Sequence, residues 1–186
     1  MKTNILPAIK LTLLFMVFFS GIYTLVLYGI AQLAPNQGKG EIILHNGKKF
    51  YTNIAQNFTD DKYFSSRPSA VAYNAAGSGG SNKGPSNPDY LAEVQARIDT
   101  FLAHNPGVSK SEIPSDLVTA SGAGLDPNIS VQAARVQVKR IAQSRGLAEE
   151  NIKQLIVSHT ERPLLGLFGT EKINVLKLNI SLDNLK

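Results

Sequence analysis

The sequence predicts an α+β fold in which one N-terminal transmembrane helix is followed by a small extracytoplasmic domain with a few strands and about three helices. Three features predict it: a 23-residue run without charges, an Asn-Gly turn signal between β-prone residues, and later segments with helical apolar spacing. We expect residues 1–10 to be a cytoplasmic N-terminus, 11–33 the transmembrane helix, 34–40 a connector and 41–186 the outer domain.

The composition excludes several classes of protein. The chain has 186 residues, which suits one modest domain plus an anchor. It has no Cys, so a disulfide scaffold, a thiolate zinc site and a cysteine nucleophile are excluded. The 19 Lys and Arg residues are scattered among 14 Asp and Glu residues. No basic stripe with interleaved aromatic residues is present, and the charge pattern therefore argues against nucleic-acid binding.

The uncharged run extends from Leu11 to Leu33 and reads LTLLFMVFFSGIYTLVLYGIAQL. As a helix it would be about 34 Å long, enough to cross a hydrocarbon layer of about 30 Å. A cleaved signal peptide is the alternative, but its apolar region should be only roughly 7–15 residues long. The sequence Ala31-Gln32-Leu33-Ala34 also lacks an A-x-A-like cleavage site. We therefore favour an uncleaved anchor.

Charges that flank the run predict its direction. Lys2 and Lys10 precede it, whereas the first charge after it is Lys39 and acidic residues follow soon. The positive-inside rule then places the short N-terminus in the cytoplasm. Lys48 and Lys49 argue slightly against this orientation.

Small residues inside the run suggest a contact with another helix. Gly21 and Gly29 are eight residues apart, so they share roughly one helical face, and Ser20 lies beside them. Small residues let a second helix approach closely. Glycine is also common in membrane helices generally, which is an equally good explanation.

The outer domain is expected to begin with a hairpin. Residues 41–44 and 49–51 are β-prone and flank His45-Asn46-Gly47-Lys48, and Asn-Gly favours a tight hairpin turn. Residues 67–87, RPSAVAYNAAGSGGSNKGPSN, are dense in Gly, Ser, Asn and Ala. This composition alone favours a flexible linker, whereas an ordered loop that needs glycine backbone geometry is the alternative.

Three helices and a strand are predicted after this segment. Asn87 and Pro88 have the character of a helix start, and the helix should end at Asn105-Pro106-Gly107 after an apolar face formed by Leu91, Val94, Ile98 and Leu102. Residues 114–129 form a second loop, after which Ser130 should cap a helix that ends at Gly146 and buries Val131, Ala134, Val138 and Ile141. A third helix over 149–158 should bury Ile152, Leu155 and Ile156. Alternation of Leu176, Leu178, Ile180 and Leu182 with polar residues predicts a half-buried strand.

Catalytic motifs are absent from the sequence. No G-x-x-x-x-G-K-[ST] loop, no D-K-T-G phosphorylation motif and no G-x-S-x-G elbow occurs. The sequence Ser78-Gly79-Gly80-Ser81 is a very weak match to the signature loop of ABC transporters. A hydrolase hypothesis is possible, with a serine nucleophile at Ser78, Ser81 or Ser121 and with His159 and Asp126 as its partners. Turn formation explains these serines better.

The histidines do not predict a metal site. His45, His104 and His159 show no ligand spacing with each other or with carboxylates. A position near the carbonyl groups at a helix C-terminus explains His159. We predict neither catalytic nor metal-binding residues.

Three segments together resemble one family. The first comprises Tyr63-Phe64, Ser66-Arg67-Pro68-Ser69 and residues 73–76, 78–82 and 84–88. The second comprises residues 116–122, 124–127 and 129–130, and the third comprises His159-Thr160, Arg162, Leu165-Gly166 and residues 174–176 and 178–179. These segments resemble three motifs of the potassium-transporting ATPase C chain, a subunit of the bacterial Kdp complex. The similarity covers nearly the whole chain. Ala123 and Asn128 depart from the pattern, where Ser and His are expected.

The resemblance implies an accessory subunit without catalysis or an intrinsic cofactor, in the bacterial cell (inner) membrane. It would assemble with a channel-like potassium subunit and a P-type ATPase subunit. Such a subunit is described as a catalytic chaperone that raises ATP affinity, or it could stabilise or gate the external potassium entrance. The predicted topology favours the second, because ATP is cytoplasmic and only about 10 residues precede the span. The resemblance also implies that residues 67–87 form an ordered loop.

Ligand-binding candidates lie in the two loops. If ATP or potassium contacts this chain, the candidates are Asn74, Ser78, Gly79, Gly80, Ser81, Asn82, Ser121, Gly122 and Asp126. Uncharged oxygens suit potassium, which Asn74, Ser78, Ser81 and Asn82 could supply, although loop capping is the simpler role for them. A membrane-anchored hydrolase and an external solute-binding module remain the rival classes.

Overall fold

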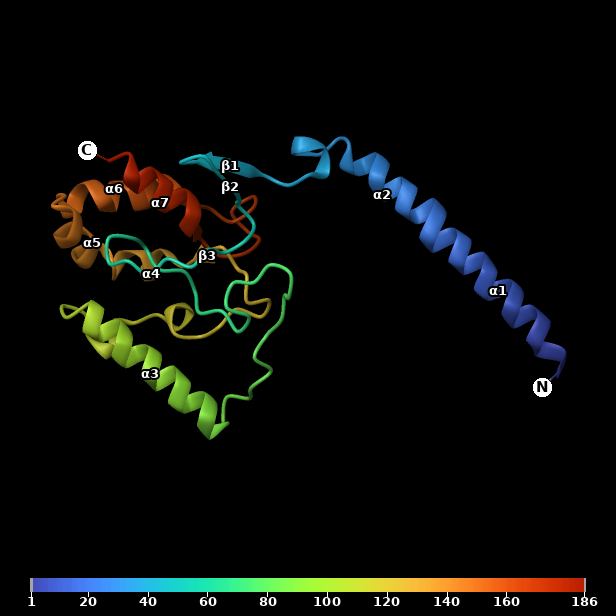
Figure 1. Cartoon of the computed structure of the whole chain (residues 1–186), viewed down its shortest axis with the longest axis horizontal. Helices are drawn as coiled ribbons and strands as arrows, with labels where there is room; N and C mark the ends of the chain where they lie inside the picture. Colours follow the sequence, from blue (N-terminus) through green and yellow to red (C-terminus); the bar gives the residue numbers. More distant parts are fainter. Residues whose placement is uncertain (1, 186) are drawn as a thin grey trace. The chain divides into compact units, whose positions relative to one another are not determined.

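A computed structural model of the chain describes residues 2–185, which divide into two compact units (Figure 1). The first unit covers residues 1–42 and the second residues 43–186. The first unit holds the long N-terminal helix, and the second holds the other described α-helices and the strands, except that the first strand begins at the boundary residue Ile42.

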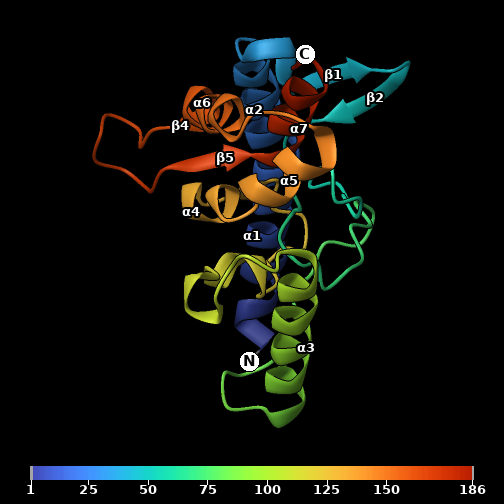
Figure 2. The same ribbon diagram turned by 90° about the vertical axis from the view of Figure 1, so that its left-hand side faces the viewer.

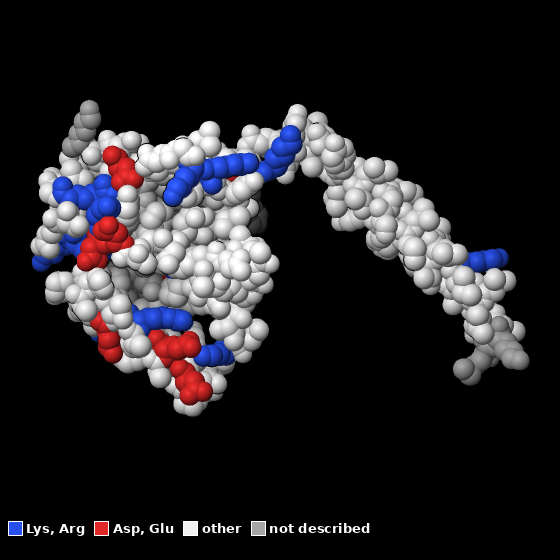
Figure 3. Space-filling model, viewed as in Figure 1, with Lys and Arg blue, Asp and Glu red and all other residues white. Residues whose placement is uncertain are grey.

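The N-terminal helix extends from Ile5 to Ala31 and contains most of the predicted apolar run. It consists of α1 (Ile5–Val17), a π-helical turn (Phe18–Tyr23) and α2 (Thr24–Ala31). Its 27 residues have a mean hydropathy of 2.1 in the most apolar window, and that window has no buried residue. Figure 3 shows an uncharged surface along most of the helix. A length of about 40 Å is enough to cross a bilayer with some tilt.

The predicted hairpin is confirmed. Strands β1 (Ile42–His45) and β2 (Lys48–Tyr51) pair through the turn at Asn46 and Gly47. Both turn residues have positive φ, 49° and 74°, as a two-residue hairpin turn of type I′ requires.

Helix α3 (Pro88–His104) begins as predicted, because the Asn87 side chain accepts a hydrogen bond from the Tyr90 amide at 3.0 Å. It lies at the edge of the domain, away from the domain's other α-helices, in both ribbon views (Figures 1 and 2). None of its residues is fully buried, and it packs on the core through half-buried Val94, Ile98 and Phe101.

The core of the domain forms around a three-stranded antiparallel sheet in the order β3 (Asn128–Ile129), β5 (Lys172–Asn174), β4 (Thr160–Glu161). Ile173 in the central strand pairs with Ile129 on one side and Thr160 on the other. Helix α6 (Glu149–His159) confirms the third predicted helix and buries Ile152 and Ile156. The largest apolar side chains of the core are Phe64, Ile129, Ile141, Ile152, Ile156, Ile173, Leu178 and Leu182.

The predicted second helix is confirmed at its ends but is interrupted. Ser130 caps α4 (Val131–Arg135) by accepting a hydrogen bond from the Ala133 amide at 3.0 Å. A second helix, α5 (Val138–Arg145), follows and ends at Gly146, whose φ is +65°. The break lies at Val136 and Gln137.

The predicted C-terminal strand is wrong, because residues 175–183 form helix α7 (Val175–Asp183). Alternating apolar residues also satisfy helical spacing here, since Leu178 and Leu182 are four residues apart and both are fully buried. The missed signal is Asn174, whose side chain caps the helix by accepting from the Lys177 amide at 3.1 Å.

A buried polar cluster holds the irregular segment 52–69, which enters the core without forming a helix or strand. We call Gln137, Arg140 and Asn179 the polar clamp. Their exposed fractions are 0%, 8% and 1%. Asn179 accepts a hydrogen bond from the Phe64 amide at 2.8 Å and donates one to the Phe64 carbonyl at 2.9 Å. Phe64 can therefore be fully buried with both of its backbone groups satisfied.

Gln137 and Arg140 complete the polar clamp. The Gln137 side-chain oxygen accepts from the Ser65 amide at 2.8 Å and from the Arg140 guanidinium at 2.7 Å. Arg140 also donates to the carbonyl groups of Asp61 and, at 3.0 Å, Tyr63. Burial lowers the pKa of Arg140, and the charge of Asp61 opposes that shift. The guanidinium, whose ordinary pKa is very high, stays protonated at neutral pH.

We predict that Asn179→Leu lowers the free energy of unfolding by about 2–4 kcal/mol, because it leaves the buried amide and carbonyl of Phe64 without partners. Urea unfolding of the full-length chain in detergent, followed by tyrosine fluorescence, measures the change. Asn184→Ala is the matched control on an exposed residue after the same helix and should change stability by less than about 0.5 kcal/mol. Equal effects of the two substitutions would contradict the role of the clamp.

Candidate functional site

The structure brings together the two loops that hold the candidate residues. We call residues 67–87 and 114–129 the loop pair. The Gly79 amide donates to the Ala123 carbonyl at 3.0 Å, and the Ser78 hydroxyl donates to the same carbonyl at 3.2 Å. The Ser69 hydroxyl donates to the Gly124 carbonyl at 2.6 Å. Residues 67–87 therefore form the ordered loop that the family resemblance implies, and the linker interpretation based on composition is wrong.

Glycine is required where the two backbones meet. A Cβ atom on Gly80 would lie 2.8 Å from the Gly122 carbonyl oxygen. Gly124 has a φ of +68°, and a Cβ atom there would lie 2.7 Å from a Val71 methyl group and 3.0 Å from the Gly79 carbonyl oxygen. These glycines serve the close approach of the loops.

An ion pair joins the bases of the loop pair. Arg67 and Asp126 lie 3.0 Å apart, and their side chains are 24% and 33% exposed. Asp126 also accepts hydrogen bonds from the amide and side chain of Asn128 at 3.0 and 3.2 Å. Ser121 is buried, and its hydroxyl accepts a weak hydrogen bond from the Asp126 amide at 3.4 Å. The side chains of Ser121 and Asp126 therefore support the loop structure.

Tyr73 holds the first loop in an uncommon conformation. Ala72 and Tyr73 both have positive φ, 51° and 59°, which is disfavoured for residues with a Cβ atom. The Tyr73 amide donates to the Ser69 hydroxyl at 2.9 Å, and its own hydroxyl donates to the Arg67 carbonyl at 2.8 Å. Burial raises the pKa of the Tyr73 hydroxyl, so the phenol remains neutral and able to donate at physiological pH.

The remaining predicted residues do not gather around one ligand position. Asn74 accepts a hydrogen bond from the Ala76 amide at 3.0 Å and thereby stabilises a local turn. Ser81 and Asn82 are exposed, and Asn82 has a φ of 52°. Asp126 lines a cavity of about 450 Å³ together with its partner Arg67.

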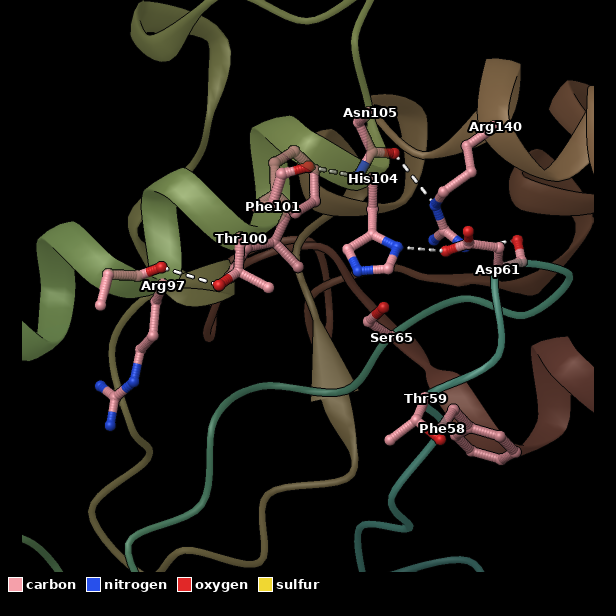
Figure 4. Close-up of a pocket in the computed structure, with 12 residues that line it drawn as sticks. Phe58, Thr59, Asp61, Ser65, Arg97, Thr100, Phe101, His104, Asn105 and Arg140 are labelled. Carbon is pink, nitrogen blue, oxygen red and sulfur yellow. Dashed lines mark hydrogen bonds and ion pairs between the residues drawn. The ribbon is translucent and has the colours of Figure 1, made fainter.

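A pocket beside α3, which the sequence reasoning missed, has a volume of about 440 Å³ (Figure 4). Phe58 and Phe101 contribute to its apolar wall. Figure 4 shows His104 facing Asp61, at 2.8 Å, and Arg140 facing Asn105, at 3.0 Å. These polar groups are engaged with one another rather than directed at an open position. The sequence gives no signal for the pocket, because its lining comes from four separate segments.

The hydroxyl and imidazole groups do not assemble the hydrolase arrangement that the sequence left open. His159 lies 2.8 Å from the Ser181 hydroxyl and 3.0 Å from the Leu155 carbonyl oxygen. Its position at the end of α6, beside a helix carbonyl, confirms the structural explanation of this residue. Ser78 instead bonds the backbone of the facing loop.

The family described as K+-transporting ATPase, c chain (KdpC) matches residues 5–184, which include both the N-terminal helix and the domain. The chain belongs to the KdpC family. It is 58% identical to the potassium-transporting ATPase KdpC subunit of Flavobacterium psychrophilum over 184 residues, which cover 98% of this chain and 99% of the relative.

Two further KdpC subunits support the same assignment. The one from Bacteroides fragilis is 55% identical over 190 residues, covering 100% of this chain and 99% of the relative. The one from Caldanaerobacter subterraneus subsp. tengcongensis is 50% identical over 184 residues, covering 98% and 95%. The resemblance inferred from the three motifs is thereby confirmed.

The two departures from the expected KdpC pattern have local explanations. Ala123 contributes its backbone carbonyl to the loop contact, so that contact does not need a hydroxyl side chain. Asn128 donates its side-chain amide to Asp126 at 3.2 Å and so supports the ion pair with Arg67.

We predict that Gly124→Ala lowers the free energy of unfolding by about 1–3 kcal/mol, because it combines a strained φ with a clash against Val71. Gly77→Ala is the matched control in the same loop pair, since an added Cβ atom there meets nothing within 4 Å. Thermal unfolding of both full-length variants in detergent compares them. A control as unstable as Gly124→Ala would show that glycine flexibility, not close approach, matters here.

Proposed function

We propose that this chain is a non-catalytic accessory subunit of a bacterial ATP-driven potassium uptake pump, anchored in the cell membrane by one span. The observation that supports this most is the family match over residues 5–184, with relatives that are named subunits of a potassium-transporting ATPase. Its partners are then the potassium-channel-like subunit and the P-type ATPase subunit of the complex.

Charge distribution supports an orientation with the domain outside the cytoplasm. Lys10 lies near the start of the helix, which begins at Ile5. In that orientation the second unit, which begins at Ile43, lies on the opposite side of the membrane from cytoplasmic ATP. In this orientation, a contribution to ATP affinity would reach the ATPase subunit through the assembly and not through direct contact with nucleotide.

The domain would act through its shape and surfaces. Three candidate residues bond across the loops: Ser78 and Gly79 donate to the Ala123 carbonyl, and Asp126 pairs with Arg67. Such a network supports a rigid body that stabilises partner subunits or shapes the external potassium entrance. It favours this role over that of a solute-binding module, whose pocket would present polar groups to a ligand.

We predict that Ala75→Cys is labelled by a membrane-impermeant maleimide in intact spheroplasts that express the pump. Ala75 is exposed in the first loop, and the chain has no native Cys to confuse the result. Asn4→Cys, on the other side of the helix, is the control and should react only after the cells are opened. The reverse labelling pattern would place the loop pair in the cytoplasm, where direct contact between this chain and ATP is possible.

We predict that the tagged full-length chain co-purifies from mild detergent with two larger membrane subunits. The purified chain alone should hydrolyse no ATP, because it has no P-loop and no phosphorylation motif. Recovery of an unaccompanied chain from membranes that contain both other subunits, or ATP hydrolysis by the chain alone, would contradict the accessory role.

A further inference from the structure

An exposed apolar turn joins β4 to β5 and projects from the domain (Figure 2). We call residues 163–168, Pro-Leu-Leu-Gly-Leu-Phe, the apolar turn. Its four large side chains, those of Leu164, Leu165, Leu167 and Phe168, are 71%, 80%, 80% and 65% exposed. No side chain between Pro163 and Phe168 carries a hydrogen-bonding group. Clustered exposed apolar residues of this kind mark a surface that contacts another apolar phase.

Four backbone amides of the apolar turn donate hydrogen bonds within it. The amide and carbonyl groups of Leu164 and Phe168 bond to each other at 3.1 and 3.0 Å. The Leu167 amide donates to the Leu164 carbonyl at 3.1 Å, and the Gly166 amide donates to the Pro163 carbonyl at 2.9 Å. A turn with internally bonded peptide groups can enter an apolar medium without leaving these donors unpaired.

The backbone conformation of the turn is energetically unfavourable for leucine, and the Leu165 side chain points into solvent. Leu165 and Gly166 both have positive φ, 56° and 72°, as in a type I′ turn, where Asn and Gly are the preferred residues. A leucine in this left-handed conformation is disfavoured, and its side chain is 80% exposed. Neither local backbone preference nor core packing explains a leucine at this position, whereas an external apolar contact does.

We propose that the apolar turn inserts into the lipid bilayer that holds the N-terminal helix. This inference rests on the membrane anchoring in the proposed function. Ten residues, 32–41, separate the helix from β1, and they span at most about 35 Å. The bilayer is therefore an apolar phase that always lies within reach of the domain. Arg162 and Lys172 flank the turn, but so do Glu161, which lies 3.6 Å from Lys172, and Glu171. Since these charges balance, the exposed apolar side chains and not attraction to anionic headgroups would drive the insertion.

Depth-dependent quenching tests this insertion on the full-length chain alone. The Leu165→Cys variant is labelled at the new thiol with an environment-sensitive NBD fluorophore. The labelled protein is then reconstituted into vesicles of phosphatidylcholine and phosphatidylglycerol at a ratio of three to one. Lipids brominated on their acyl chains serve as the quencher. Val157→Cys is the matched control, since Val157 is an equally apolar, 67% exposed residue on α6. We expect quenching at position 165 to be at least about threefold stronger than at position 157.

A third label separates failure of this inference from failure of membrane anchoring. Val26→Cys lies inside the N-terminal helix and should be strongly quenched in the same vesicles. If position 26 is quenched while position 165 is not, the anchor is correct and bilayer insertion of the turn is wrong. If the label at position 165 is then protected from water only in the assembled pump, a partner subunit and not lipid covers the apolar turn. Absence of quenching at position 26 would instead contradict the anchoring itself.

A variant that keeps the turn tests the role of its apolar side chains. Leu165→Asn suits the left-handed conformation better than leucine, so the domain should remain folded. Combined with Leu167→Asn, it should reduce quenching of a label at Phe168→Cys by about threefold in the same vesicles. Unchanged quenching in this folded variant would overturn the proposal.

Discussion

The burial of Phe64 within a segment that forms neither helix nor strand is the constraint on which the domain depends. Such a segment cannot pair its peptide groups with a neighbouring strand, and unpaired groups in a core are strongly destabilising. The polar clamp solves this problem from two helices, because Gln137 and Arg140 come from the α4–α5 region and Asn179 comes from α7. The clamp thereby ties residues far apart in sequence into one core.

The position of the loop pair follows from this arrangement. The clamped segment leads directly into Arg67, which pairs with Asp126, and then into the glycines that contact the second loop. Second-loop residues in turn lead into β3 and the cap of α4 at Ser130. The most unusual part of the sequence thus packs against the loop that leads into α4. Loops that bond to each other in this way are consistent with a subunit that works by contacting other proteins.

Elements with local signals were predictable from the sequence, and those set by distant contacts were not. Asn46-Gly47 specifies the hairpin, and Asn87 with Pro88 specifies the start of α3, because each turn or cap depends on adjacent residues. The apolar residues between 175 and 183 fit both the two-residue period of a strand and the spacing of a helix, so the pattern alone does not decide between them. Nothing near Asn179 in the sequence indicates that its side chain is buried against Phe64. The choice of loop-pair residues as ligand candidates stays a prediction, and the contacts between the loops, over about 45 to 55 positions, depend on the completed core. The pocket beside α3 is likewise assembled from distant segments.

Hydrogen exchange of individual amides in the full-length chain tests the central claim most directly. If the clamp holds the irregular segment in place, the amides of Phe64 and Ser65 exchange only through global unfolding, as slowly as that of Ile141 in the core helix α5. Exchange of these two amides through local opening, at the rate of exposed turn amides, would contradict the account.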